Sequence, residues 1–158
     1  MILVDTSAWV EYDRATGSPV DRRLTELITD EGPIAVTEPV VMELAAGART
    51  HESEMDLRRL LLRFALLTFD TVVDFDAAAN IYRACRRVGV TPRGMIDCMI
   101  AAVALRHGAT LLAFDADMNR VAEVIGISLD LGTHSARGES RSVESCHLVR
   151  TEGDARYH

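Results

Sequence analysis

Short apolar runs alternate along the chain with longer segments in which apolar residues recur at helical spacing. Four of the runs have the length and composition of buried strands, and they cover residues 2–4, 34–36, 67–73 and 110–114. Residues 127–131 are a candidate for a fifth strand, at an edge of the sheet. Strands that alternate with helical segments predict a parallel sheet with helices on both of its faces.

The helical segments between the strands carry start and stop signals. Helices are expected through Trp9 and Val10, from Pro19 to the break at Gly32, from Glu38 to Gly47, over 55–67, over 78–88, from Pro92 to His107 and over 121–125. The apolar stripe of the 78–88 helix is expected to end at Cys85 and Val88. Leu62 and Leu66 lie off the apolar face of the 55–67 helix, which indicates burial either against a partner or against another helix.

Length, charge and cysteine content restrict the kinds of protein that fit. The 158 residues are the size of one domain, and no apolar run approaches the roughly 18 residues of a membrane span. The first residues form a strand rather than a secretory leader, so a soluble, cytoplasmic protein is expected. The net charge of −7 argues against broad, sequence-independent coating of nucleic acid, although a local basic patch is compatible with it. The three cysteines lack the close pairs of a zinc site and cannot form a closed disulfide framework.

The composition changes near residue 133. From there to residue 158 the chain is rich in Ser, Arg, Glu and Gly and has no sustained apolar period, which predicts a flexible C-terminal tail. The folded domain is therefore expected to cover residues 1–132.

Five acidic residues stand where strands end or where a helix is otherwise apolar. Asp5 and Asp115 directly follow the first and the fourth expected strand, and Asp117 comes two residues later. Ligands of parallel sheets gather at the carboxyl ends of the strands, so these acids are placed for a site. Glu43 and Asp97 lie on apolar helices, where an ionised acid is costly unless it is paired or binds a metal. If the acids converge, each close pair repels by about 1–4 kcal/mol, which a divalent cation would relieve.

Each acid alone also has an ordinary structural explanation. Asp5 could cap a helix, Glu43 could reach solvent or pair with an arginine, and Asp97 could be favoured in a first turn by the helix dipole. Asp115 and Asp117 could be loop acids. The order and setting of the five favour a shared site, and oxygen donors alone suit Mg²⁺ or Mn²⁺ rather than zinc or copper. Such a site can activate a water and bind phosphate oxygens, as metal-dependent nucleases do.

These acids lie within motifs that resemble a known family. The motifs are ILVDTSAWVEY, EPVVMELAAG and IYRACRRVGVTPRGMIDCMIAAVALRHGATLLAFDADM. Together with their spacing, they are similar to the PIN-domain ribonucleases, and specifically to the VapC toxins of bacterial VapBC toxin–antitoxin pairs. The resemblance covers residues 1–131. It implies a PIN-like three-layer α/β/α fold whose central, mostly parallel sheet has four to five strands.

The resemblance also implies a function and the residues that carry it. The family's metal ligands carry over onto Asp5, Glu43, Asp97 and Asp115, with Asp117 as the usual fifth acid nearby. In the family these acids hold Mg²⁺ or Mn²⁺ and cleave RNA to leave a 5′-phosphate and a 3′-hydroxyl, and the hydroxyl of Thr6 or Ser7 would orient a metal-bound water. VapC proteins are typically homodimers, and a VapB antitoxin inhibits them by laying its tail across the active-site groove.

Four arginines are candidates for contacts with RNA or with the antitoxin. Arg83, Arg86 and Arg87 share one helical face, and Arg93 lies one turn before Asp97 if that helix extends far enough back. The forked guanidinium suits phosphate oxygens, and in this family it could equally meet antitoxin carboxylates. A solvated face that pairs with acids explains the first three arginines equally well, whereas the position of Arg93 ties it to the acids.

Two other functions fit part of the pattern. A haloacid-dehalogenase-like phosphatase also places an aspartate after its first strand. It expects a second acid where this chain has Ser7, and the chain has no lysine for that family's cation role. A catalytically idle PIN domain that only binds RNA or a protein partner would keep the fold without the reaction.

Overall fold

A four-stranded parallel sheet lies at the centre of the fold in the computed structural model, which describes residues 1–130. The strands are β1 (Ile2–Val4), β2 (Ile34–Val36), β3 (Ala65–Leu66) and β4 (Thr110–Leu112), in the order β3-β2-β1-β4. A parallel bridge between Leu111 and Leu129 extends the sheet beyond β4, where the sequence predicted a fifth strand. The tail expected over 133–158 lies outside the described residues.

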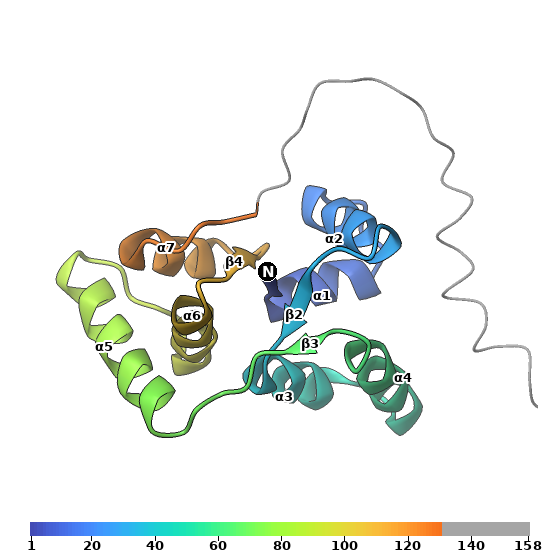
Figure 1. The fold of residues 1–158 in the computed structure, drawn as a ribbon, viewed down its shortest axis with the longest axis horizontal. Helices are drawn as coiled ribbons and strands as arrows, with labels where there is room; N and C mark the ends of the chain where they lie inside the picture. The colour runs from blue at the N-terminus through green and yellow to red at the C-terminus, as the bar shows by residue number, and fades with distance from the viewer. Residues whose placement is uncertain (131–158) are drawn as a thin grey trace, which may run out of the picture.

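Seven helices cover the sheet in this part of the chain. They are α1 (Thr6–Asp13), α2 (Pro19–Thr29), α3 (Glu38–Gly47), α4 (His51–Leu61), α5 (Val73–Arg87), α6 (Met95–His107) and α7 (Ala116–Ile125). Figure 1 shows α1 to α4 on one side of the strands and α5 to α7 on the other. Right-handed crossovers require this division, because the chain moves from β1 towards β3 in one direction and then returns to β4 on the far side of β1. The result is the predicted three-layer α/β/α fold.

The order of the strands creates one place where a ligand can enter. Connections from the carboxyl ends of β1 and β4 lead to opposite faces of the sheet, which leaves a crevice between those two ends. The amide of Asp5 donates to the carbonyl of Leu112 at 2.9 Å, so the two strands stay paired up to that crevice. Asp5 and Asp115, which cap α1 and α7, therefore stand on its two sides.

Buried side chains on both faces of the sheet hold this arrangement. Leu3 and Leu111 of neighbouring strands are fully buried, as are Val40 on α3 and Ile100 on α6. Burying each such side chain contributes about 1.5–3 kcal/mol. These contacts fix α3, which carries Glu43, and α6, which carries Asp97, to the sheet. Within residues 1–130 no helix is long and apolar enough to cross a membrane.

Several element boundaries differ from those predicted. The 67–73 strand is wrong, because Asp70 instead accepts hydrogen bonds from the amides of Val72 at 2.8 Å and Val73 at 2.9 Å and so starts α5 there. The strand of this region is instead β3, at Ala65–Leu66. Because β3 occupies part of the helix expected over 55–67, α4 ends earlier than expected, at Leu61. Val88 is 63% exposed rather than buried, because it follows the last turn of α5.

The start of α6 also differs from the prediction. Thr91 and Pro92 do not open the helix; it begins at Met95 after Gly94, whose backbone is extended (φ −150°, ψ 166°). Glycine is a poor residue for a helix interior, so the helix starts beyond it. Arg93 consequently lies in the loop between α5 and α6 rather than on the face of α6.

Two leucines that lie off the core face remain uncovered. Leu62 is 84% exposed and Leu66 is 51% exposed, so no other helix of the described chain buries them. Of the two explanations that the sequence left open, burial against another helix is not seen within residues 1–130.

An ion pair with a buried carboxylate and a partly exposed arginine joins α5 to α6. Asp74 is fully buried, and its two carboxylate oxygens accept from Arg106 Nε at 2.9 Å and Nη2 at 2.8 Å. Burial opposes ionisation of Asp74, but the Arg106 hydrogen bond and the Asp70 amide hold the pKa of Asp74 below its ordinary value. Because Asp97 is on α6, this pair also fixes the helix that carries it.

Candidate active site

Asp5 lies at the carboxyl end of β1 and caps α1. Its backbone is extended (φ −71°, ψ 157°), and its Oδ2 accepts from the amide of Ser7 at 2.9 Å and from the Ser7 hydroxyl. Asp5 is only 4% exposed. Burial raises the pKa of Asp5, and the charge of Glu43 adds to that effect, although the hydrogen bonds from Ser7 oppose it.

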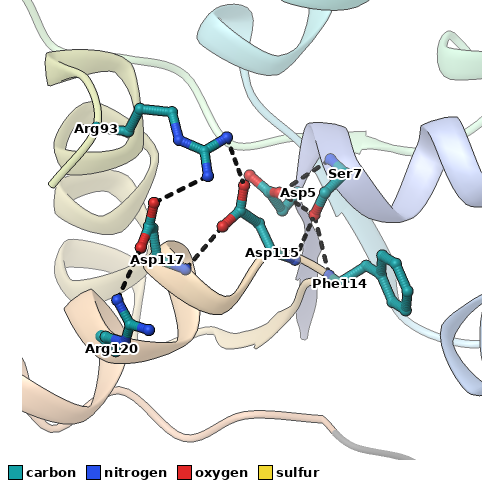
Figure 2. A network of polar contacts seen from close by, with 7 residues as sticks. All are labelled: Asp5, Ser7, Arg93, Phe114, Asp115, Asp117 and Arg120. Carbon is teal, nitrogen blue, oxygen red and sulfur yellow. Dashed lines mark hydrogen bonds and ion pairs between the residues drawn. The ribbon is translucent and has the colours of Figure 1, made fainter.

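The Ser7 hydroxyl connects the ends of β1 and β4 (Figure 2). It donates to Asp5 and accepts from the amides of Phe114 at 2.9 Å and Asp115 at 3.2 Å. One donor and two lone pairs are all that a hydroxyl offers. Ser7 therefore acts as a structural tie between two acids, and its bonding capacity is used without a water.

Glu43 and Thr6 meet across α3 and α1. The Thr6 hydroxyl donates to Glu43 Oε2, a contact between residues that are 37 positions apart in the chain. The bond orients the Glu43 carboxylate on a helix whose other face is buried through Val40 and Leu44. Unlike Ser7, the Thr6 hydroxyl accepts no hydrogen bond from residues 1–130, so both of its lone pairs are left for another group.

Asp115 and Asp117 form a second group of acids at the start of α7, as Figure 2 shows. Asp115 accepts from the amide of Asp117 at 2.7 Å. Arg93 Nη2 lies 3.1 Å from Asp117 Oδ2, and Arg93 Nη1 lies 3.7 Å from Asp115 Oδ2. Arg120 Nη1 approaches the other Asp117 oxygen, Oδ1, at 3.0 Å.

Asp97 lies in the first turn of α6, where the charges of both groups of acids act on it. Burial raises the pKa of Asp97 from 3.8 to about 6, and the charges of Asp5, Glu43, Asp115 and Asp117 add to the rise in that order. Four elements separated in sequence therefore deliver five carboxyl groups to one crevice. A carboxyl group with a perturbed pKa at such a place marks a candidate functional site.

The chemistry of these side chains fits a hard divalent cation. The five groups offer oxygen ligands alone, which Mg²⁺ and Mn²⁺ prefer. In the described part of the chain, however, no three of them are already arranged to hold one ion. Hydrogen bonds to Ser7 and Thr6 and the ion pairs with Arg93 hold the carboxylates in separate groups.

The predicted arginines have different surroundings. Arg93 contacts the acids, whereas Arg86 and Arg87 are exposed in the last turn of α5 and form no ion pair with the five carboxyl groups. Sequence reasoning missed Arg120, although its spacing of three residues from Asp117 on a helix was a usable signal. It also missed Phe114, a half-exposed aromatic residue beside the acids.

A groove of about 520 Å³ opens beside this site between α1, α3 and α4. Thr6 and Glu43 line the end that adjoins the acids, and Arg14 and Arg49 also line the groove. Its apolar lining includes Trp9, whose buried indole Nε1–H has no hydrogen-bond partner among residues 1–130. An unpaired buried donor is costly to stability, and because this indole N–H is covered by other atoms it does not face a ligand in the groove.

Sequence comparison relates the chain to ribonucleases. The PIN domain family matches residues 2–124. Ribonuclease VapC11 of Mycobacterium tuberculosis is 46% identical over 128 residues, which cover 80% of this chain and 96% of that protein. Ribonuclease VapC32 of the same organism is 33% identical over 132 residues, covering 82% of this chain and 96% of that protein.

Solved structures share the fold. VapBC2 from Rickettsia felis, bound to a DNA fragment from its promoter, aligns with a TM-score of 0.64 at 21% identity and covers 82% of this chain and 97% of that one. FitAcB from Neisseria gonorrhoeae aligns with a TM-score of 0.60 at 23% identity and covers 82% of this chain and 96% of that one. At these identities the similarity establishes the three-layer fold alone.

Proposed function

This chain belongs to the PIN-domain family and, within it, to the VapC ribonucleases, and from that premise we propose that it is a Mg²⁺- or Mn²⁺-dependent endoribonuclease acting as the toxin of a VapBC pair. The observation that carries the proposal is the convergence of five carboxyl groups at the crevice between β1 and β4. Asp97 links the two groups of acids, because burial raises its pKa and the charges of the four other acids add to that rise.

Each residue of the site has a proposed part. Asp5, Glu43, Asp97 and Asp115 hold the cation, with Asp117 as a fifth ligand or as a support for Asp115. A divalent cation bound by these carboxylates would supply an activated water and would offset charge on the scissile phosphate. Ser7 fixes the carboxylate of Asp5 and its distance from β4, and Thr6 orients Glu43 and has lone pairs left to position the attacking water.

RNA is proposed to cross the exposed side of the acids. Arg93 has a side chain that is 74% exposed and already lies beside Asp115 and Asp117, so it is placed to bind a phosphate next to the reacting one. Arg86 and Arg87 remain candidates for a more distant phosphate or for an antitoxin carboxylate.

Cleavage of total cellular RNA by the antitoxin-free protein tests the activity. Fragments should appear with Mg²⁺ or Mn²⁺ and disappear with excess chelator and in the Asp97→Asn variant. The exposed Asp76→Asn variant, which loses the same charge elsewhere on the surface, should cleave like the wild type. Metal-independent fragments, or full activity in Asp97→Asn, would remove the proposed mechanism.

A catalytically idle domain is the second candidate, and one observation favours it. No three acids among the described residues are prearranged around one ion, as a binding-only protein would allow. Well-folded protein that binds RNA but leaves it intact in every metal would establish this function instead.

The partner is proposed to be a VapB-type antitoxin that occupies the groove between α1, α3 and α4. Apolar antitoxin side chains would pack on the apolar lining of the groove, which includes Val10, Leu44 and Leu57, and acidic side chains would pair with Arg14 and Arg49. Arg49→Glu should weaken binding of the cognate antitoxin about tenfold, or about 1.4 kcal/mol. Arg59→Glu, an exposed charge reversal at a residue that does not line the groove, should leave it unchanged.

A homodimer is also proposed, with Leu62 and Leu66 in its interface. Leu66 lies on the edge strand β3 and Leu62 just before it at the end of α4, and exposed apolar side chains at a sheet edge suit a contact with a second copy. Light scattering of the antitoxin-free chain should give twice the monomer mass, and Leu62→Glu should return the monomer. A wild-type monomer would refute the dimer.

A further inference from the structure

Arg93 holds together the two acids at the start of α7. It contacts Asp117 at 3.1 Å and Asp115 at 3.7 Å through different nitrogens of one guanidinium. Its side chain is 74% exposed and comes from the loop before α6, next to Gly94. An exposed side chain from the loop before α6 therefore reaches both acids at the start of α7.

The arginines are distributed unevenly over the five acids. Asp115 and Asp117 have Arg93 and Arg120 beside them. In residues 1–130 no arginine forms an ion pair with Asp5, Glu43 or Asp97, and the first two accept hydroxyl hydrogen bonds instead. Arginine side chains thus bring positive charge to Asp115 and Asp117, whereas the other three acids have no arginine paired with them within residues 1–130.

We infer that Arg93 exchanges partners during the reaction cycle: it neutralises Asp115 and Asp117 in the metal-free protein and turns to an RNA phosphate when a divalent cation takes its place. This inference rests on the proposed function, since it concerns the same acids. It assigns Arg93 as a positioning residue that connects metal binding to RNA binding.

The geometry makes the exchange inexpensive. An exposed ion pair contributes only about 0.2–1 kcal/mol, so a divalent cation can displace the guanidinium from the two carboxylates. Arg120 approaches the other oxygen of Asp117 from the same helix, and this keeps Asp117 oriented after Arg93 leaves. The released guanidinium lies at the edge of the acids, where its fork matches two phosphate oxygens.

The first measurement is Mn²⁺ affinity of the full chain without RNA, by electron paramagnetic resonance. Arg93→Gln should bind Mn²⁺ about two- to fivefold more tightly than the wild type, because the cation no longer competes with a guanidinium. The control is Arg59→Gln, since Arg59 is a similarly exposed arginine, 71% accessible, that pairs with an aspartate on α4. It loses the same charge and should leave Mn²⁺ affinity unchanged.

The second measurement is binding of a fluorescein-labelled, phosphorothioate-linked single-stranded RNA, with a chelator and with saturating Mn²⁺. With the chelator, Arg93→Gln and the wild type should bind equally, because Arg93 is occupied by the two acids. With Mn²⁺, Arg93→Gln should bind several-fold more weakly. Opposite effects on metal and on RNA are a signature that a purely structural role of Arg93 would not give.

Three results would overturn the exchange. They are unchanged or weaker Mn²⁺ binding in Arg93→Gln, RNA binding that weakens equally with and without Mn²⁺, and a matching change in Arg59→Gln. If wild-type protein binds Mn²⁺ no better than the Asp5→Asn/Asp97→Asn double variant, the proposed metal site itself fails and the exchange fails with it. Mn²⁺ binding that needs the acids but ignores Arg93 would overturn the exchange alone.

Discussion

The Asp97→Asn variant, which should lose activity, is expected to be more stable than the wild-type protein when no metal is present. Asp97 is partly buried and has four other acids around it, and its pKa rises from 3.8 to about 6 as a result. At neutral pH the carboxylate must nevertheless ionise in the folded protein, at a cost that an unfolded chain does not have. An amide of the same shape removes that cost.

The size of the effect follows from the pKa. A rise from 3.8 to about 6 corresponds to at most about 3 kcal/mol, because each tenfold change in a dissociation constant is about 1.36 kcal/mol. Solvent reaches part of the Asp97 side chain and screens it, which reduces the expected gain to about 1–2 kcal/mol. In a domain of this size that gain raises the melting temperature by about 2–8 °C.

The pH dependence gives the prediction its sign. Because the folded-state pKa of Asp97 is raised, the folded protein keeps a proton that the unfolded chain has already lost between about pH 4 and pH 6. The contribution of Asp97 to the free energy of unfolding of the wild type is therefore fully present below about pH 4. It is lost as the pH rises from about 4 to about 6. The two proteins should differ little near pH 4 and most above about pH 6.

The assay is thermal unfolding in the presence of a chelator at both pH values, with Asp76→Asn as the control for lost negative charge. With saturating Mg²⁺ the wild type should become the more stable of the two proteins. A ligand at a hundred times its Kd stabilises the protein that binds it by about 2.7 kcal/mol, and Asp97→Asn should not bind Mg²⁺. The reasoning is refuted if Asp97→Asn gains no more than Asp76→Asn, or if its advantage is as large near pH 4 as at neutral pH.

Three further predictions concern stability and support of the site. Arg106→Gln should cost about 2–4 kcal/mol in urea unfolding, because it leaves the buried Asp74 carboxylate without its cation; an equal stability would show that the pair is unimportant. Ser7→Ala should cost about 1–2 kcal/mol and weaken Mn²⁺ binding measured by calorimetry, because it releases Asp5 and two amides of the β4 end; unchanged Mn²⁺ affinity would contradict the tie. Deleting residues 133–158 should leave the melting temperature nearly unchanged in calorimetry, whereas a large loss would place them in the fold.

The strand-ending acids could be predicted because the signal is local. Buried parallel strands are short apolar runs, and an acid directly after such a run must stand at the carboxyl edge of the sheet. Asp5 and Asp115 satisfy that condition in the sequence and lie at that edge in the structure. The acids on helices were also predicted from a local signal, because Glu43 and Asp97 each interrupt an otherwise apolar helix.

The ion pairs of Arg93 with Asp115 and Asp117 could not be predicted from local signals, which placed Arg93 one turn before Asp97 on the same helix. The cap and first-turn proline at Thr91 and Pro92 resemble a helix start, but Gly94 defers the helix by three residues. Arg93 reaches Asp117 only because α6 and α7 pack side by side over the sheet, a relation set by tertiary packing. Tertiary packing determines which residues pair when they lie far apart in sequence.

Asp74 and Asp97 show which further observation separates a structural acid from a functional one. Both are aspartates in the first turn of a helix beside apolar residues, and the sequence offers little to distinguish them. Arg106 lies against Asp74 and lowers its pKa, whereas Asp97 is surrounded by other acids and its pKa rises to about 6. Like charges beside Asp97 oppose its ionisation and add nothing to stability, which is the pattern expected of a functional site rather than of a structural ion pair. The shared cation proposed above would account for that arrangement, whereas Asp74 is accounted for by its ion pair with Arg106.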